Sequence, residues 1–184
     1  MTICVGNTSL QRFLPEHTDL LYDLSNRPEV RKGMSKSAEI PYESHVSWVK
    51  ENLIEGNNVH LFLVIKENQA LGAALIKNIT QDSAELGIIV GDSIAAERMF
   101  LTSKLLAGIL FYTFYEMKLQ YLNIRILLEN SKSIATAKKI GAAFQVQDET
   151  YNHFLLEKTK YENFPLNKLL LKRYQPFMHS NLNG

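Results

Sequence analysis

Residues Glu85 to Phe144 of this 184-residue sequence contain the pattern most typical of a binding or catalytic site. They are predicted to hold a strand, Glu85–Val90, and then a loop, Gly91–Ser103, that leads into an apolar helix. Backbone N–H groups in the first turn of a helix have no intrahelical acceptor, and the helix dipole is positive there. The order strand, loop, helix therefore predicts an anion site where the loop enters the helix.

Hydrophobic periodicity predicts the elements that would position this site. We expect helices from Thr18, from Pro28, over Tyr42–Ile54, over Lys104–Leu119 and from Asn130 to Gly141. The expected strands are Leu10–Leu14, Val59–Lys66, Ala70–Ile79, Ser83–Val90, Tyr121–Leu128, Phe144–Glu149 and Tyr151–Lys158. Short polar turns predict an antiparallel meander for the second, third and fourth strands, and Gly72 marks a bulge or a close backbone approach in the third. The helix that follows predicts a crossover, so part of the sheet should be parallel.

Composition sets limits on the class of protein. Hydrophobic residues make up 46% and charged residues 21%, which is ordinary for a globular protein, and we expect one domain over residues 1–184. The net charge of +1 favours neither a nucleic-acid nor a membrane partner. The single cysteine, Cys4, excludes an intramolecular disulfide, and no histidine spacing predicts a metal. With no signal-peptide pattern and no sufficiently long apolar run, we expect a cytoplasmic protein.

Several local segments resemble the GNAT family of acyl-CoA-dependent N-acetyltransferases. The most specific is Asn130-Ser-Lys-Ser-Ile134, which runs on to a glycine at Gly141, and Ala84–Ile88 resembles the fourth strand of the family. The segments Asn26–Arg31 and His45–Trp48 look like the branch that acetylates nucleotide-linked amino sugars, parts of which ribosomal-protein N-acetyltransferases share. The resemblance covers roughly residues 8–158, with 159–184 as a C-terminal extension.

The resemblance implies a fold and a co-substrate. The fold is of the α/β (α+β mixed) class, with a central mixed, mostly antiparallel sheet of six to seven strands and helices on both faces. Acetyl-CoA would lie where the strand ending at Val90 splays from the strand Tyr121–Leu128. Its pantetheine arm would pair with the backbone of Ile88, Ile89 and Val90. Asn130 would bond to pantetheine, cap its own helix, or do both.

The phosphate loop of the family matches positions Arg98, Met99, Phe100, Leu101, Thr102 and Ser103. Leu101 stands where the family has glycine, and we expect its bulk to lie beside the pyrophosphate. Glu97 opposes an anion there, and Lys104 could offset that charge. On this alignment, Leu101→Gly should tighten acetyl-CoA binding.

Acetyl transfer to an amine needs a proton acceptor, because an alkylammonium must lose a proton before it attacks. Glu85 is the expected general base, with a solvated strand residue as the alternative. The family often protonates the leaving thiolate with a tyrosine, but that position is Ala137, so water or Tyr151 would serve. Arg31 and His45 are expected on the acceptor side, although His45 could equally be a packed residue.

Three functions fit these residues. The first is an N-acetyltransferase that moves an acetyl group from acetyl-CoA to a primary amine of a small molecule, such as a nucleotide-linked amino sugar. The second is a protein or peptide N-terminal acetyltransferase. The third is a GNAT-like binding module with degenerate catalysis, which Leu101 and the missing tyrosine favour. The aromatic helix residues Phe111, Tyr112 and Tyr115 belong to the core or, where that face is open, to a homodimer contact.

Overall fold

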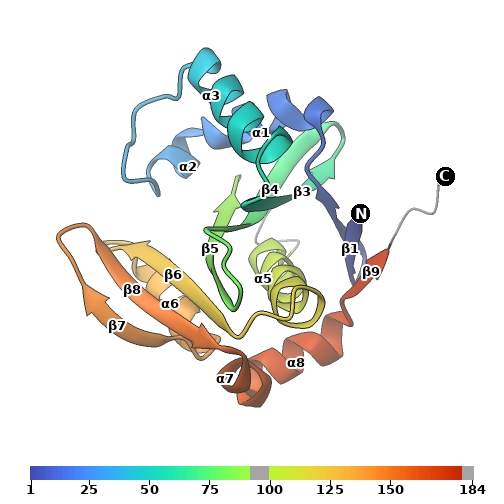
Figure 1. The fold of residues 1–184 in the computed structure, drawn as a ribbon, viewed down its shortest axis with the longest axis vertical. Helices are drawn as coiled ribbons and strands as arrows, with labels where there is room; N and C mark the ends of the chain where they lie inside the picture. Colours follow the sequence, from blue (N-terminus) through green and yellow to red (C-terminus); the bar gives the residue numbers. More distant parts are fainter. Residues whose placement is uncertain (92–99, 180–184) are drawn as a thin grey trace.

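A computed structural model describes residues 1–91 and 100–179 of the chain. One nine-stranded sheet runs through this part, in the order β7-β8-β6-β5-β4-β3-β2-β1-β9 (Figure 1). The strands are β1 (Thr2–Val5), β2 (Thr8–Arg12), β3 (Val59–Lys66), β4 (Gln69–Lys77), β5 (Ser83–Val90), β6 (Tyr121–Leu127), β7 (Ala143–Gln147), β8 (Tyr151–Glu157) and β9 (Phe177–His179). Neighbouring strands are antiparallel except β5 and β6, which are parallel. The expected mixed, mostly antiparallel α/β fold is therefore confirmed.

Helices cover both faces of the sheet. One face carries α1 (Thr18–Ser25), α2 (Pro28–Arg31) and α3 (Tyr42–Val49), which lie together near β3 and β4 in Figure 1. Leu21 and Leu24 of α1 pack there against Leu61 and Ala73. The larger core lies on the other face, under α5 (Leu101–Phe111), α6 (Ser131–Lys139), α7 (Lys158–Asn163) and α8 (Pro165–Tyr174). Alternation along the strands separates the two cores, because successive side chains point to opposite faces.

The predicted meander is confirmed as β3, β4 and β5. The two-residue turn between β3 and β4 places Glu67 at φ 50° and Asn68 at φ 58°, as a tight hairpin requires. The pairing of β3 with β4 shifts register beside Gly72, where Val64 pairs with Gly72 but Ile65 pairs with Ala70. A side chain at Gly72 would stand 3.0 Å from the carbonyl oxygen of Ile89, so both the bulge and the close approach are present.

The expected count of six to seven strands was too low. The additional strands are β1 and β9, which pair with each other at one end of the sheet. They have only four and three residues, too few for an alternating pattern to mark them in the sequence. Residues 177–179 therefore complete the sheet, and the α7–α8 segment connects them to β8.

The helices begin and end close to their predicted bounds, with two differences. The helix expected over Tyr42–Ile54 changes after Val49 to a wider π turn over Lys50–Ile54. The helix expected from Lys104 begins at Leu101 and changes to a π turn over Tyr112–Glu116. On this second turn, Tyr112 is buried, while Tyr115 is half-exposed beside Tyr161.

No helix in residues 1–91 or 100–179 combines the length and the apolar character that a membrane crossing requires.

Candidate active site

Strands β5 and β6 pair along only part of their length. Their parallel ladder covers Ser83–Leu86 of β5 and Tyr121–Ile124 of β6, and the strands then diverge (Figure 1). On its other edge, β5 stays paired with β4 as far as Val90. The Gly91 amide donates to Leu71 on that β4 side at 3.0 Å, and backbone groups alternate in direction along a strand. Ile88 and Val90 therefore direct their N–H and C=O groups toward the side where β6 has moved away.

The N-terminus of α5 lies after the end of β5 and has no side-chain cap. Its N-cap residue, Phe100, is left-handed at φ 51°, and the first helical bond runs from the Lys104 amide to the Phe100 carbonyl at 3.1 Å. The amides of Leu101, Thr102 and Ser103 precede that bond, so the helix supplies them with no acceptor. The Arg173 guanidinium of α8 lies 5.2 Å from the centre of the Phe100 ring. This terminus thus combines helix-end amides with a nearby cation, as an anion site needs.

Two expectations for this helix end were wrong. The side chain of Leu101 is fully buried and packs over Gly72, so its bulk lies in the core and not beside the helix-end amides. Lys104 does not face the site either. Its ammonium donates to Asn7 Oδ1 at 2.7 Å and to Thr8 Oγ1 at 2.9 Å. The expected loop residues Glu97, Arg98 and Met99 lie outside the described residues.

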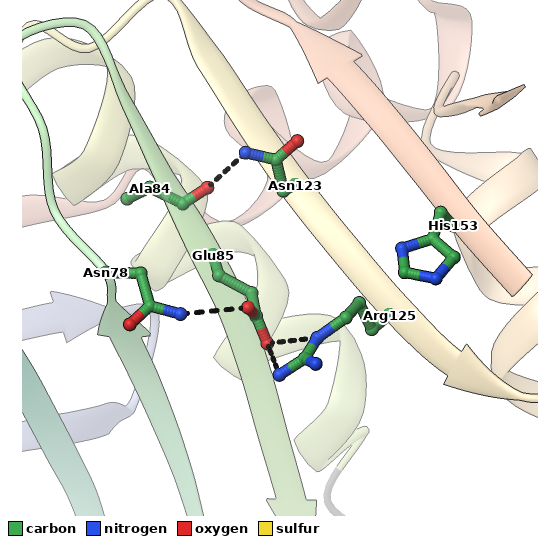
Figure 2. A pocket seen from close by; sticks show the side chains of 6 residues that line it. All are labelled: Asn78, Ala84, Glu85, Asn123, Arg125 and His153. Carbon is green, nitrogen blue, oxygen red and sulfur yellow. Dashed lines mark hydrogen bonds and ion pairs between the residues drawn. The ribbon is translucent and has the colours of Figure 1, made fainter. Parts of the chain in front are cut away.

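A polar pocket of about 340 Å³ lies near the end of the β5–β6 ladder, beside the point where the two strands part. Asn78, Ala84, Glu85, Asn123, Arg125 and His153 line it (Figure 2). Its side chains come from the face of β5, β6 and β8 opposite α5, because Ala84, Leu86, Leu122 and Ile124 point into the larger core instead. Amide, carboxylate, guanidinium and imidazole groups together suit a polar ligand that both donates and accepts hydrogen bonds.

Glu85 lies in this pocket, with its side chain 12% exposed. Oε1 accepts from Arg125 Nε at 3.0 Å and lies 2.9 Å from Arg125 Nη2 and 3.1 Å from Lys77 Nζ. Oε2 accepts from Asn78 Nδ2 at 3.1 Å (Figure 2). Partial burial raises the pKa of the Glu85 carboxyl, but the bonds and charges of Lys77 and Arg125 lower it by more, so the net shift is downward. The group is therefore a well-bound carboxylate, which is a weak proton acceptor.

A second acid lies close to His153. Asp148 Oδ2 is 2.6 Å from His153 Nε2, and Asp148 Oδ1 accepts from the amides of Thr150 and Tyr151, each at 2.7 Å. The bond from His153, together with the two backbone bonds, lowers the pKa of Asp148 to about 2. Tyr151 lies beside this pair, with its ring 5.3 Å from the Arg125 guanidinium and 6.4 Å from the His153 ring.

The remaining expected residues take other positions. Asn130 caps α6, since its Oδ1 accepts from the Ser133 amide at 3.1 Å. His45 is buried, and its Nε2 lies 3.0 Å from the Thr18 carbonyl, where it joins α3 to α1. Arg31 bonds to the Lys36 carbonyl on the surface of the helical layer. Neither His45 nor Arg31 lines the polar pocket.

Sequence reasoning missed most of the polar pocket. Asn78, Asn123, Arg125 and His153 come from two strands and one turn, and only the register of the sheet brings them to Glu85. Alternation on β6 and β8 was a usable signal, because Asn123, Arg125 and His153 are the polar residues that alternate with Leu122, Ile124 and Phe154. In the described part of the chain, no group of His, Cys, Asp and Glu has the arrangement of a metal site.

Comparisons with known proteins agree with this geometry. A family model described as an acetyltransferase (GNAT) domain matches residues 8–143. The acetyltransferase PseH of Campylobacter jejuni is 21% identical over 150 residues, which are 82% of this chain and 92% of that protein. Its structure in complex with acetyl coenzyme A aligns with a TM-score of 0.58 at 17% identity, over 82% of this chain and 99% of that one.

Other solved structures share the fold more closely. The spermidine N-acetyltransferase from Vibrio cholerae, in complex with CoA and spermine, aligns with a TM-score of 0.72 at 15% identity. That alignment covers 85% of this chain and 98% of the other. RimL, a ribosomal alpha-N-protein acetyltransferase in complex with coenzyme A, has the same TM-score at 14% identity, with the same coverage. At these identities, the structures establish the fold alone.

Proposed function

The chain belongs to the GNAT acetyltransferase family, and from this premise we propose that it acetylates a primary amine on a small, hydroxyl-bearing molecule such as a nucleotide-linked amino sugar. It is an acyl-CoA-dependent N-acetyltransferase with acetyl-CoA as its co-substrate. What we propose is the chemical class of the acceptor amine. The observation that carries it is the polar pocket around Glu85, at the point where β5 and β6 part.

The composition of the pocket favours a polar acceptor with one positive charge. Glu85 is the only carboxylate among the described lining residues. Within the described chain, its Oε2 atom accepts from Asn78 alone, so it can take one more donor such as an ammonium. Asn78, Asn123 and Arg125 add donors and acceptors of the kind that bind hydroxyl groups. A polyamine would gain more from several carboxylates than from amides and a guanidinium. The pocket chemistry therefore supports an amino sugar over a polyamine.

The part of the site that would hold acetyl-CoA has residues that fit it. The amides of Leu101, Thr102 and Ser103 suit its pyrophosphate, and Arg173 adds a positive charge at the same helix end. The unpaired edge at Ile88 and Val90 suits an amide-bearing chain such as pantetheine. Acetyl-CoA supplies an acyl carbon that is open to attack by an amine. Ile89 belongs to the same strand, but its backbone groups face β4 by the alternation described above.

Two further residues have proposed roles. Tyr151 is close to Arg125 and His153, and it would be the donor that protonates the leaving thiolate. Asn130 caps α6, and its amide nitrogen would be the group that reaches pantetheine. Arg31 and His45 do not line the polar pocket, so we expect their substitution to lower turnover less than substitution of Glu85.

Thiol release tests this function directly. Purified protein would be supplied with acetyl-CoA and, in parallel, with UDP-glucosamine, D-glucosamine, spermidine or a short peptide with a free α-amine. We expect the two amino sugars to give the highest kcat/KM, and Glu85→Gln to raise KM for the amine about tenfold. A tenfold preference for spermidine or the peptide would overturn the acceptor proposal.

A matched control separates the acceptor pocket from the co-substrate site. Glu85→Gln should leave acetyl-CoA affinity unchanged by isothermal titration, whereas Arg173→Ala should weaken it and leave KM for the amine unchanged. If the wild-type protein binds no acetyl-CoA at millimolar concentration, the co-substrate assignment fails with the rest.

A further inference from the structure

We propose that His153, oriented by Asp148, is the general base that takes the proton from the acceptor ammonium. This inference rests on the proposed function and deepens it, since it assigns proton removal at the same pocket. Glu85 then binds and orients the ammonium without accepting its proton.

The Asp148 carboxylate is held in one orientation by the backbone. The two backbone bonds to Oδ1 come from the amide of Thr150, in the turn before β8, and from the amide of Tyr151, the first residue of β8. These bonds leave Oδ2 for the imidazole, 2.6 Å from His153 Nε2. A side chain with two backbone bonds on one oxygen needs no further ordering to orient its partner through the other oxygen.

This contact determines which nitrogen of His153 carries the proton. Asp148 is a carboxylate at neutral pH, because its pKa lies at about 2, so it can only accept. Nε2 must therefore donate, and in the neutral imidazole the lone pair is on Nδ1. His153 lines the pocket, and Figure 2 shows one ring nitrogen on the side that faces Asn123 and Glu85. A basic nitrogen thus faces the space in which the acceptor would bind.

The register of the sheet brings this base to the point of transfer. His153 pairs across β8 and β6 with Arg125, and Arg125 follows the last β6 residue that pairs with β5, Ile124. The imidazole is therefore level with the position where β5 and β6 part. In the strand order β8-β6-β5, His153 lies two strands from β5, and adjacent strands are about 4.8 Å apart. An amine bound between them would therefore reach His153 through one water.

Glu85 is less suited to proton removal. Its carboxylate carries an ion pair with Lys77, two contacts from Arg125 and a bond from Asn78, and these partners stabilise the charged form. Among the described residues, the contact of the His153 ring with an acid is the one with Asp148, and it leaves Nδ1 without such a partner. The two groups thus divide the work, with Glu85 attracting the ammonium and His153 receiving its proton.

The step balances without any further reagent. One ammonium proton passes to His153 Nδ1, and the freed lone pair on nitrogen forms the C–N bond to the acyl carbon. The C–S bond breaks, and its electron pair stays on sulfur. Tyr151 gives its proton to that thiolate and regains one from the second proton lost from nitrogen, and the imidazolium returns its proton to water. The products are an amide, a free thiol and one proton.

The alternative is that the pair only fastens the β7–β8 hairpin, since Asp148 and His153 both belong to it. A fastening role predicts lower stability and unchanged chemistry. A base predicts a change in the pH dependence of kcat. The titratable and charged groups around the imidazole are Asp148, Tyr151, Arg125 and, across the pocket, Glu85 with its partner Lys77.

The test compares four variants with UDP-glucosamine and acetyl-CoA, by thiol release from pH 5 to pH 9. His153→Ala should lower kcat by about 10²-fold or more and leave acetyl-CoA affinity unchanged. Asp148→Asn keeps an acceptor for the amides of Thr150 and Tyr151, but its NH2 group would face Nε2 and favour the tautomer with the proton on Nδ1, so it should also lower kcat by about 10²-fold or more. Glu85→Gln should raise KM for the amine. Its kcat should still decrease toward acid pH, as we expect for the wild-type protein. The control, His179→Ala, alters an exposed histidine at the far edge of the sheet and should change nothing.

Added imidazole gives the decisive readout. It should restore part of the activity of His153→Ala, because a small base can occupy the space of the lost side chain, whereas a lost hairpin contact cannot be restored in this way. Wild-type kcat should fall toward acid pH, and His153→Ala should lose that fall. If His153→Ala keeps both the rate and the acidic fall, while Glu85→Gln loses them, Glu85 is the base and the proposal is wrong. If the wild-type protein acetylates none of the amines, the proposed function is wrong, and the role of His153 as a base is then wrong as well.

Discussion

The two helices that flank β6 begin in opposite ways. At α6, Asn130 closes the first turn with its own side chain, through a 3.1 Å bond from the Ser133 amide. At α5, Phe100 takes a left-handed conformation and contributes no side-chain cap, so the first three amides depend on something outside the helix. A structural helix end is satisfied by its own sequence, whereas a binding end leaves its donors for a ligand. We therefore expect the pyrophosphate of acetyl-CoA to bind at the start of α5, whereas the side-chain oxygen of Asn130 is occupied in capping α6.

The largest expected effect tests whether α5 is anchored by its first residue. Leu101→Gly removes a fully buried side chain from the start of α5 and adds backbone freedom, so it should cost about 3–5 kcal/mol of the free energy of unfolding. The measurement is chemical denaturation of both proteins. Thr102→Gly, at the exposed next position, is the matched control and should cost about 1 kcal/mol or less. Equal costs for the two variants would show that Leu101 is not an anchor.

A charge swap tests whether the two helix ends differ in their ligand. Ser103→Glu puts a carboxylate beside the open amides of α5 and should weaken acetyl-CoA binding about tenfold or more, which is about 1.4 kcal/mol. Ser133→Glu puts the same group at the matching position of α6 and should leave binding unchanged, with α6 slightly more stable. Isothermal titration of both variants measures the difference. Similar losses of affinity in both would remove the contrast between the two helix ends.

The smallest effects concern the residues that precede the helices, and they should have opposite signs. Asn130→Ala removes a cap and should cost about 1 kcal/mol of the free energy of unfolding. Phe100→Gly relieves a left-handed residue, worth about 1–2 kcal/mol, but loses the contact with Arg173, worth about 0.5–1 kcal/mol. The net gain should be about 0.5 kcal/mol. A loss of stability in Phe100→Gly would mean that the contact between the Phe100 ring and Arg173 contributes more free energy than the left-handed backbone costs.

The sequence was a good guide where the signal is local. Strands with alternating or continuous apolar residues, such as Val59–Lys66, form as expected, and Gly141 ends α6 with φ 90°. Asn130 could be identified as a cap because capping depends on the residue and the three that follow it. The family and its mixed sheet followed from the same kind of local pattern.

Long-range contacts account for what the sequence could not predict. Lys104 was expected to offset Glu97, but it bonds to Asn7 and Thr8, which lie almost a hundred residues earlier. The left-handed residue at the start of α5 is Phe100, and a bulky side chain gives no hint of positive φ. Leu101 did carry a signal that went unused, since it lies four residues before Leu105 on the same buried face. The polar pocket needed the register of three strands, which a single sequence does not encode in any local pattern.

The pairing of β9 with β1 has a consequence for the order of folding. Phe177–His179 must meet Thr2–Cys4 across almost the whole described chain, and closing so long a loop costs more entropy than any other pairing in the sheet. Three residues return few ladder bonds, so β9 should dock only after Leu170 and Tyr174 of α8 have packed on the core and the Gly6 amide has bonded to the Tyr174 carbonyl. The same strand should be the first to detach during local unfolding. The β9 edge of the sheet should thus be the last part of the described chain to assemble and the first to open.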